Sequence, residues 1–405
     1  MKQSELPAFG NLQGVRVVST GTNIAGPVAC SLLAEQGADV IQVESTAARD
    51  IMRYIGDLWT VEHRNNRTIA LNIRSEQGEG VLKKLIARCD ILVESSKGGT
   101  WTKWGLTDEV LWDLNPRLVI AHVSGYGQSG DPDYVTRGSF DPIGQAFSGF
   151  LAVNGMPEPE PPLHAKPYTC DYVTALFTAW AITAALYRAA QTGKGESVDV
   201  AQYEVMARIQ ADYLMNGLNK GIQAPRMGIF GNTVCALPNV QRCKDGNYIM
   251  TGIGGVPVFR NLEKLLGLEG DPDFAEPHSK IDRDEHPRSD KIVGAMSQFC
   301  ASHTAVEAND ILNKLDIPCS VVMTYEMMKN HPHYLARETF TSWQDPITGH
   351  EMKGINLIPK FSKNPGQIFR GGPTYGMDNE DILRELGYSD AETARMYETG
   401  VIKKA

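Results

Sequence analysis

Asp171 is the residue whose type and position could most directly do chemistry. It stands immediately before a run without charged residues, 172–187, which predicts a helix buried inside a globular protein. A carboxylate at the positive end of such a helix stays ionised while it loses part of its water, and that combination suits a nucleophile. The same position suits a plain helix cap, which is worth about 1 kcal/mol and is far commoner than a catalytic acid. The residues alone leave both interpretations open.

Two glycine-containing segments are candidates for binding negative charge. Gly254 and Gly255 offer unobstructed backbone N–H groups, as a flap that stabilises an oxyanion would need, although an ordinary loop fits as well. Residues 20–27 lead from a short apolar run into a helix start, where anions bind. This loop lacks G-x-G-x-x-G and the Lys-Ser/Thr pair of a P-loop. Glu44, in the place of a ribose-binding acid, is therefore only a weak argument for a nicotinamide dehydrogenase.

The histidines and cysteines show no pattern of a metal site or a disulfide framework. His331 and His333 form a close pair without a carboxylate-rich helix nearby, and His122 falls in an apolar run typical of a core strand. No G-x-S-x-G is present, which disfavours a serine hydrolase of that type. The widely spaced cysteines, without C-x-x-C, favour reduced thiols and a cytoplasmic protein. They are Cys30, Cys89, Cys170, Cys235, Cys243, Cys300 and Cys319.

The first third of the chain alternates strand-like and helix-like patterns. Apolar runs predict strands at residues 15–19, 38–44, 68–73, 90–95 and 117–124. Helical patterns lie between them, and such β-α-β alternation with largely apolar strands is typical of a doubly wound parallel sheet covered on both faces. Sites in these sheets lie at the carboxyl ends of the strands. We therefore expect chemistry in the loops at 21–27, 95–99 and 124–130.

Length and charge limit the class of protein. The chain has 405 residues, more than the roughly 250–300 at which a single core usually divides. Residues 228–322, with a hairpin pattern around Asp245-Gly246, predict a second, smaller α+β domain. The net charge of −9 argues against a nucleic-acid partner. No membrane partner is expected either, because the long uncharged runs at 17–34 and 172–187 are shorter than the ~20 apolar residues of a span and the N-terminus lacks the apolar core of a signal peptide.

Several motifs occur together in an order that one family has. They are Ala25-Gly26-Pro27, Arg64–Arg67 followed by Ile69–Asn72, Ser124–Gln128, and Gly193–Val200. On these motifs the chain resembles the class III CoA-transferases over essentially its whole length. The motifs are specific in combination, and the residue that matches the family's nucleophile is Asp171.

The resemblance implies an enzyme that moves CoA from an acyl-CoA to a small carboxylic acid. Asp171 would attack the donor thioester and form a mixed anhydride, which the released CoA thiolate would convert to an aspartyl-CoA thioester. The acceptor acid would then take the CoA by the same steps in reverse. One thioester is exchanged for another, so no metal and no tightly bound cofactor are expected, and CoA enters as a substrate. Gly254 and Gly255 match the family's flap, which belongs to the catalytic site.

The resemblance also implies where CoA binds and how the chain folds. CoA contacts are expected at Lys97, at Lys103 beside the position of a second basic contact, and at Asn72 and Ile24. The implied fold is an interlaced homodimer of two ring-like chains, each with a Rossmann-like large domain built from both chain ends. The predicted large domain is 1–200 and 374–405, the small domain 228–322, and the linkers 201–227 and 323–373.

Within the family, several segments look most like the members that use carnitine. These are Ala146–Phe150, Pro167–Tyr172, Pro359–Phe361 and Asn364–Gly371. Two positions separate other relatives: Ile24 replaces the glutamine of the oxalate-using transferases, and Phe140 replaces the histidine base of the α-methylacyl-CoA racemases. The expected substrates are L-carnitine and γ-butyrobetainyl-CoA or crotonobetainyl-CoA. The alternatives are a CoA-transferase for another carboxylic acid and an α-methylacyl-CoA racemase.

Overall fold

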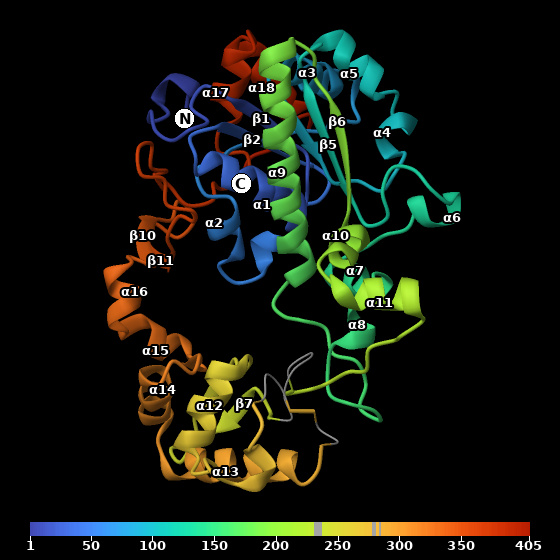
Figure 1. Ribbon diagram of the computed structural model, residues 1–405. Helices are drawn as coiled ribbons and strands as arrows, with labels where there is room; N and C mark the ends of the chain where they lie inside the picture. The colour runs from blue at the N-terminus through green and yellow to red at the C-terminus, as the bar shows by residue number, and fades with distance from the viewer. Residues whose placement is uncertain (231–236, 278–280, 283–284) are drawn as a thin grey trace. The chain divides into compact units, whose positions relative to one another are not determined.

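The computed structural model describes residues 1–230, 237–277, 281–282 and 285–405 (Figure 1). By its internal contacts the chain divides into two compact units. The first unit comprises Met1–Phe150, Ala165–Ile222 and Leu335–Ala405, and the second comprises Leu151–His164 and Gln223–Tyr334.

Parts of the predicted linkers, residues 201–222 and 335–373, belong by contact to the first unit. The reason is packing and hydrogen bonding with the rest of that unit. The helix that begins at Gln202 lies against the long helix that begins at Thr169. The backbone N–H of Gly372 donates to the carbonyl oxygen of Thr60 at 3.0 Å.

A six-stranded sheet forms the centre of the first unit. Its strands are β1 (Arg16–Ser19), β2 (Asp39–Glu44), β3 (Arg67–Ala70), β4 (Ile91–Glu94), β5 (Val119–Ser124) and β6 (Ser197–Ala201). Every neighbouring pair is parallel, in the order β3-β2-β1-β4-β5-β6. This confirms the predicted mixed α/β class with a central parallel sheet. The order reverses between β1 and β4, the kind of point at which doubly wound sheets bind ligands outside the carboxyl ends of their strands.

Helices surround this sheet, and a short hairpin lies apart from it. The helices are α1 (Ala25–Ala34), α2 (Leu58–Glu62), α3 (Glu76–Ile86), α4 (Thr100–Lys103), α5 (Asp108–Leu114), α6 (Pro132–Val135), α7 (Asp141–Phe147), α9 (Thr169–Thr192), α10 (Gln202–Arg208), α11 (Asp212–Lys220), α17 (Asn379–Glu385) and α18 (Asp390–Glu398), with the 3-10 helices η1 (Gln3–Glu5) and η2 (Ile51–Tyr54). The hairpin pairs β10 (Phe340–Gln344) with β11 (Glu351–Ile355). The helices α8 (Phe150–Val153) and α16 (Pro332–Ala336) lie where the chain passes from one unit to the other.

Helices cover both faces of the sheet (Figure 1). Apolar side chains fill the space between the sheet and these helices. On one face, α1 and α9 pack against inward-pointing strand residues such as Val17 and Val93. On the other, α3 and α5 pack together with α17 and α18, whose Ile382 and Met396 are buried. Because the strands meet apolar layers on both sides, they occur in the sequence as continuous hydrophobic runs.

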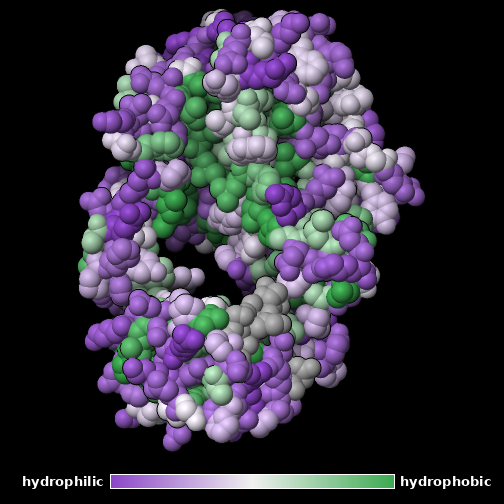
Figure 2. Space-filling model, viewed as in Figure 1, coloured by the Kyte–Doolittle hydropathy of each residue, from purple (hydrophilic) through white to green (hydrophobic). Residues whose placement is uncertain are grey.

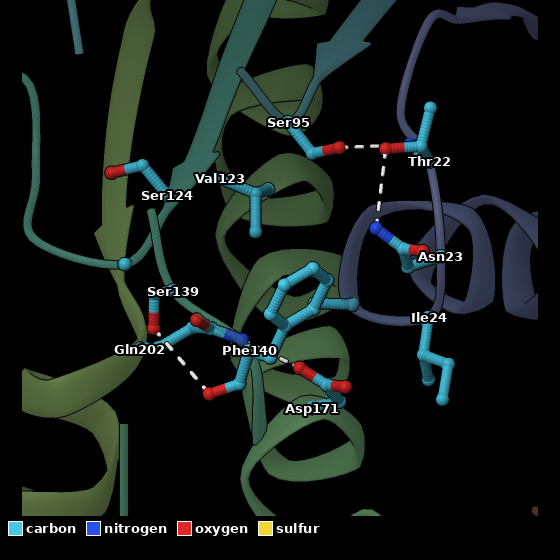
Figure 3. Close-up of a pocket in the computed structure, with 12 residues that line it drawn as sticks. Thr22, Asn23, Ile24, Ser95, Val123, Ser124, Ser139, Phe140, Asp171 and Gln202 are labelled. Carbon is cyan, nitrogen blue, oxygen red and sulfur yellow. Dashed lines mark hydrogen bonds between the residues drawn. The ribbon is translucent and has the colours of Figure 1, made fainter. Parts of the chain in front are cut away.

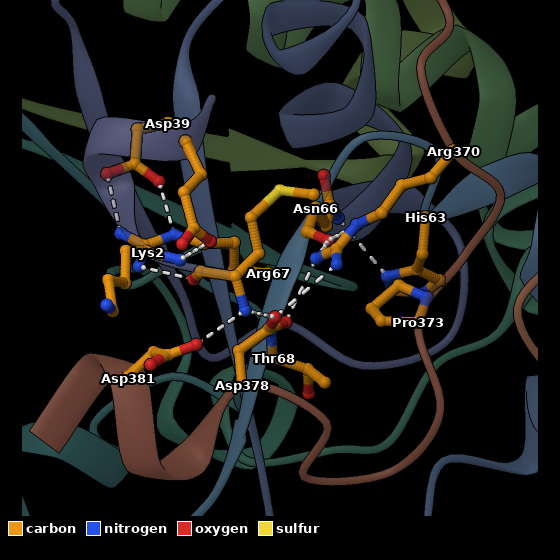
Figure 4. Close-up of polar contacts among 12 residues, drawn as sticks. Lys2, Asp39, His63, Asn66, Arg67, Thr68, Arg370, Pro373, Asp378 and Asp381 are labelled. Atoms are coloured by element: carbon orange, nitrogen blue, oxygen red, sulfur yellow. Dashed lines mark hydrogen bonds and ion pairs between the residues drawn. The ribbon is translucent and has the colours of Figure 1, made fainter. Parts of the chain in front are cut away.

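Buried ion pairs join the N-terminus, the sheet and the C-terminal helices (Figure 4). Arg67 donates from Nε and Nη2 to the two carboxylate oxygens of Asp39 at 2.9 and 2.8 Å. Asp378 accepts from Arg370 and from the amino group of Met1, both at 2.9 Å. Breaking such a pair leaves a buried charge uncompensated, at a cost of about 3–5 kcal/mol. Arg67, at the end of one of the recognised motifs, therefore has a structural role.

The second unit is a small antiparallel sheet with helices. Its strands are β7 (Val240–Arg242), β8 (Tyr248–Thr251) and β9 (Cys319–Val321), and its helices are α12 (Val256–Leu265), α13 (Arg288–Ser302), α14 (Ala305–Lys314), α15 (Tyr325–Asn330) and the 3-10 helix η3 (Pro272–Phe274). The predicted hairpin turn is confirmed, with Gly246 at a φ of +82°. Phe259, Ile292 and Leu312 form part of this unit's own core.

The described cysteines are all free thiols, five of them buried and Cys319 half-buried. Cys235 lies outside the described residues. Among the described residues, no group of three or more His, Cys, Asp or Glu side chains is placed to hold a metal ion. One helix, α9, is long and apolar enough to cross a membrane by its length and composition. In the fold it is a covering helix of the sheet, since its inner face packs on α1 and β5.

Candidate active site

A pocket opens at the carboxyl ends of the central strands, beside the point where the strand order reverses (Figure 3). The loop after β1 contributes residues 22–25, β4 is followed by Ser95, and the end of β5 contributes residues 123–125. Asp171 from α9 and Gln202 from α10 complete the lining together with Ser139 and Phe140. The three loops in which chemistry was expected, 21–27, 95–99 and 124–130, thus all contribute lining residues to the same pocket.

Asp171 does not cap its helix. It is the third residue of α9, and the residue before the helix, Tyr168, makes no side-chain cap. The cap comes from another helix: Oδ1 of Asp141, the first residue of α7, accepts from the backbone N–H groups of Cys170 at 2.7 Å and of Asp171 at 3.2 Å. The interpretation of Asp171 as a plain helix cap is therefore wrong, because its carboxylate accepts no hydrogen bond from the N–H groups at the start of α9.

Asp141 is itself held in place. The side-chain amide of Gln145, one turn further along α7, donates to Asp141 Oδ2 at 2.7 Å and to the carbonyl oxygen of Ala165 at 3.0 Å. The same side chain accepts from the backbone N–H of Ala165 at 2.9 Å. Both oxygens of Asp141 are thus engaged, and the segment that enters α9 is fixed against α7.

The Asp171 carboxylate is nearly removed from solvent, with 7% of the residue exposed. Gln202 Nε2 donates to Asp171 Oδ1 at 2.5 Å, and the two side chains point toward each other in the pocket (Figure 3). Within the described residues Oδ2 accepts no hydrogen bond. Burial, and then the charge of Asp141, raise the pKa of Asp171 to about 7, while the hydrogen bond from Gln202 acts in the opposite direction. The site holds a poorly hydrated carboxylate that is about half ionised near neutral pH.

The loop after β1 brings Ile24 into the same pocket as Asp171. Ile24 is 1% exposed and packs with Trp59 and Ala175. The preceding residue, Asn23, has a φ of +64°, and its backbone N–H donates to Asp50 at 2.9 Å. A sharp turn held in this way places an apolar side chain, where a glutamine was the family alternative, at the edge of the site.

The other predicted CoA contacts lie outside this pocket. Lys97 is exposed in the loop after β4, with its Cε 3.5 Å from the point that a Cβ on Gly138 would occupy. Lys103 is exposed at the end of α4. Asn72 follows β3, and its side chain accepts from the backbone N–H of Arg74 at 3.2 Å, so it shapes a turn.

The predicted flap glycines belong to the second unit, between β8 and α12. Gly254 and Gly255 are both exposed. Gly255 precedes α12 with a φ of +84°, a conformation that favours glycine. The local backbone thus explains why glycine stands there.

Phe140 lines the pocket at the position where a racemase would carry its histidine base. Its ring is 62% exposed and cannot take up a proton. Among the lining residues Asp171 is the one ionisable side chain, so the described pocket lacks the second base that a racemase needs. This arrangement disfavours the racemase alternative.

Sequence reasoning missed Asp141 and Gln202. Asp141-Pro142 is a typical helix start and could have been recognised as one, but nothing local says that this carboxylate caps a helix 30 residues later. Gln202 directly follows β6 and carries no motif. Both functions arise from contacts between α7, α9 and α10.

A buried carboxylate in a pocket at the carboxyl ends of a doubly wound sheet is a candidate for the functional group of an enzyme. A comparison with known protein families identifies the kind of enzyme: residues 12–379 match the model of CoA-transferase family III. The chain belongs to this family, as the motifs predicted, and is a class III CoA-transferase.

Relatives support the assignment over nearly the full chain. The chain is 42% identical over 405 residues to the bile acid CoA-transferase BaiK of Clostridium scindens, with 98% of this chain and 91% of that protein covered. The crystal structure of a CAIB/BAIF family protein from Brucella suis matches with a TM-score of 0.78 at 26% identity, covering 94% of this chain and all of that one. The M. tuberculosis protein Rv3272 matches with a TM-score of 0.77 at 25% identity, over 93% and 100% of the two chains. The enzyme therefore uses CoA thioesters and carboxylic acids as substrates.

Proposed function

We propose that this enzyme transfers CoA through covalent intermediates on Asp171. The observation that carries the proposal is the carboxylate itself, which is buried and held through Oδ1 by Gln202. The second oxygen, Oδ2, is left for attack. A carboxylate that has lost most of its water needs little further desolvation to react with a thioester carbonyl.

The proposed reaction begins when Oδ2 of Asp171 attacks the donor thioester. The C–S bond breaks, the thiolate leaves with the electron pair, and a mixed anhydride forms. The thiolate then attacks Cγ of Asp171, and the Cγ–Oδ2 bond breaks. The donor acid leaves as a carboxylate that carries Oδ2, and an aspartyl-CoA thioester remains. The acceptor carboxylate reverses both steps and leaves one of its own oxygens on Asp171.

Water must be kept from these intermediates, because a mixed anhydride hydrolyses readily. The burial of Asp171 and the apolar side chains of Ile24 and Val123 beside it supply part of that protection. For the catalytic flap we retain Gly254 and Gly255, on the motif match and the positive φ of Gly255.

CoA brings phosphate groups to a protein whose net charge is −9. Local positive charge is therefore needed, and Lys97 and Lys103 are the proposed contacts. Both are exposed, on the loop after β4 and on the helix that follows it. Asn72 and Ile24 are proposed as further CoA contacts.

Two classes of acceptor acid are proposed, each on its own observation. The 42% identity to a bile acid CoA-transferase supports a bulky, largely apolar carboxylic acid. The motifs shared with carnitine-using members support L-carnitine, with γ-butyrobetainyl-CoA or crotonobetainyl-CoA as donor. Initial rates with bile acids, L-carnitine and γ-butyrobetaine as acceptors for one acyl-CoA donor decide between them, because the physiological class has the higher kcat/KM by orders of magnitude.

We further propose that the enzyme is a homodimer. The outer face of α9 exposes Leu176, Trp180 and Tyr187 at 57%, 70% and 69%. Hydrophobic side chains gather over the region of α9 (Figure 2). A second copy is the occupant that the family resemblance supports, and a contiguous exposed apolar face of this kind marks an interaction site. Light scattering should give twice the mass of the 44.4 kDa chain, and a monomer would contradict the proposal.

Intact-mass analysis tests the covalent mechanism. Incubation with acyl-CoA alone should produce a species heavier by the CoA thioester, and hydroxylamine should convert Asp171 to a hydroxamate found in the peptide that contains it. Asp171→Asn should form neither adduct and should have no transferase activity. Full activity of Asp171→Asn, with no adduct in the unaltered enzyme, would refute the mechanism.

A further inference from the structure

Gln202 is a buried neighbour of the Asp171 carboxylate. It is the first residue of α10, directly after β6, and only 6% of it is exposed. Its Nε2 lies 2.5 Å from Oδ1 of Asp171 (Figure 3). An amide facing a carboxylate presents its NH₂ group, since an ionised carboxylate only accepts hydrogen bonds.

The backbone N–H groups at the start of α9 already donate hydrogen bonds to another residue. The backbone N–H groups at the start of a helix commonly stabilise negative charge. Here the N–H groups of Cys170 and Asp171 donate to Asp141 instead. Within the described residues, Gln202 is therefore the one donor to the Asp171 carboxylate.

The backbone beneath the Gln202 amide is closely packed. A Cβ placed on Gly144 of α7 would lie 3.2 Å from the Cβ of Gln202 and 2.6 Å from Sγ of Cys170. The thiol of Cys170 in turn donates to the carbonyl oxygen of Gln202 at 3.8 Å. The helices α7, α9 and α10 thus meet at short range around this residue, and its donor is placed before any substrate arrives. Preorganised donors of this kind need no rearrangement at the moment of reaction.

We propose that Gln202 is a catalytic residue that stabilises the oxyanion formed on Oδ1 of Asp171 each time Cγ is attacked. The inference rests on the proposed function. In the anhydride and in the aspartyl thioester, Oδ1 is the carbonyl oxygen of the aspartyl group. When the thiolate sulfur, or an acceptor carboxylate oxygen, bonds to Cγ, the electron pair of the C=O bond moves to Oδ1. It returns when the Cγ–Oδ2 or Cγ–S bond breaks, and no proton is transferred.

Gln202 also bears on the ionisation of Asp171, so the two effects must be separated by pH. The groups that face Asp171 are Asp141 on α7 and Cys170 and Tyr172 on α9 itself. Tyr172 in turn donates to Glu62 on α2. Loss of the Gln202 hydrogen bond raises the pKa of Asp171 and moves the acid limb of the rate profile to higher pH. An oxyanion donor has a second effect, a lower plateau at alkaline pH where Asp171 is ionised in every variant.

The test uses Gln202→Met, which has a similar shape but no donor. Rapid-quench intact-mass measurements give the rate at which aspartyl-CoA forms from acyl-CoA between pH 6 and 9. We expect the alkaline plateau to fall about 10²-fold, the loss typical of removing one oxyanion donor, with a much smaller change in KM for acyl-CoA. Gln210→Met is the matched control, because this buried glutamine donates to the backbone oxygen of Ser148 at 2.8 Å. Its plateau should equal that of the unaltered enzyme.

A second variant, Gln202→Glu, keeps the size of the side chain in case Gln202→Met does not fold. An ionised glutamate cannot donate, so the same low plateau is expected together with a larger shift of the acid limb. A plateau within about threefold of the unaltered enzyme in either folded variant would overturn the inference. If the unaltered enzyme forms no aspartyl-CoA, the proposed function itself fails, and that result is distinct from a normal plateau in the variants.

Discussion

Replacing Asp171 by asparagine should stabilise the folded protein while it removes activity. The pKa of Asp171 is raised from the usual 3.8 to about 7 by burial and by Asp141. Below pH 3.8 the carboxyl group is protonated in both the folded and the unfolded chain, so its ionisation does not destabilise the folded protein. As the pH rises from 3.8 to about 7, the unfolded chain releases the proton first, so folding stability falls through this window and is then constant. The ionised, buried carboxylate destabilises the folded protein by about 4 kcal/mol at pH 8, and more than half of this develops between pH 5 and pH 8.

Asparagine cannot ionise, and its side-chain oxygen still accepts from Gln202. The measurement is the thermal unfolding of the unaltered enzyme and of Asp171→Asn, each at pH 5 and at pH 8 and at equal ionic strength. All other groups titrate in both proteins, so the difference between the two proteins isolates the contribution of Asp171 ionisation to stability. We expect the unfolding midpoint of the variant, relative to that of the unaltered enzyme, to rise by about 3 °C from pH 5 to pH 8. Asp212→Asn, at an exposed first turn of α11, is the control whose difference should not grow. An equal advantage of Asp171→Asn at both pH values would refute the account of its burial.

Three further substitutions test the surroundings of the proposed nucleophile and the proposed flap. Asp141→Asn removes the neighbouring charge, so the pKa of Asp171 falls and the acid limb of kcat/KM should move down by about one pH unit. An unmoved acid limb would mean that burial alone raises the pKa of Asp171. Gly144→Ala places a Cβ 2.6 Å from Sγ of Cys170 and 3.2 Å from Cβ of Gln202, so either these side chains or α7 must shift. We expect kcat to fall at least about tenfold with the substrates' KM nearly unchanged, and an unchanged kcat would show that Asp171 and Gln202 stay in place. Gly255→Ala puts a side chain at a φ of +84°, which costs about 1 kcal/mol and should slow CoA transfer relative to acyl-CoA hydrolysis; an unchanged ratio would contradict the flap assignment.

The sheet was predictable because almost all residues of its strands are buried between apolar layers. Strands buried on both faces need apolar residues throughout, so the first five runs in the sequence lie within two or three residues of β1 to β5. The hairpin around Gly246 is likewise specified by local residues, and it is observed. The strand β6 follows the long helix α9, and its residues were singled out in the sequence only as part of the family motif Gly193–Val200.

The site was predictable only in part. Asp171 and its pocket loops follow from strand ends and helix starts, which the sequence shows. The contacts of Asp171 with Asp141 and Gln202 join residues 30 and 31 positions apart. Such contacts depend on how α7 and α10 pack against α9, and neighbouring residues in the sequence do not encode them. His122 shows the same limit: a core strand position was predicted, but not its hydrogen bonds with the carboxylates of Glu94 and Asp108.

The central claim is that Asp171 becomes covalently bonded to its substrates, and transfer of oxygen tests it most directly. The enzyme is allowed to turn over with an acceptor acid whose two carboxylate oxygens are oxygen-18, and the peptide that contains Asp171 is then weighed. In the proposed sequence the acceptor leaves one of its oxygens on Asp171 in place of the oxygen that left with the donor acid, so this peptide should become heavier by the mass difference between oxygen-18 and oxygen-16. The same peptide should stay unlabelled when only the solvent water carries oxygen-18. Complete turnover without label in Asp171 would contradict the account.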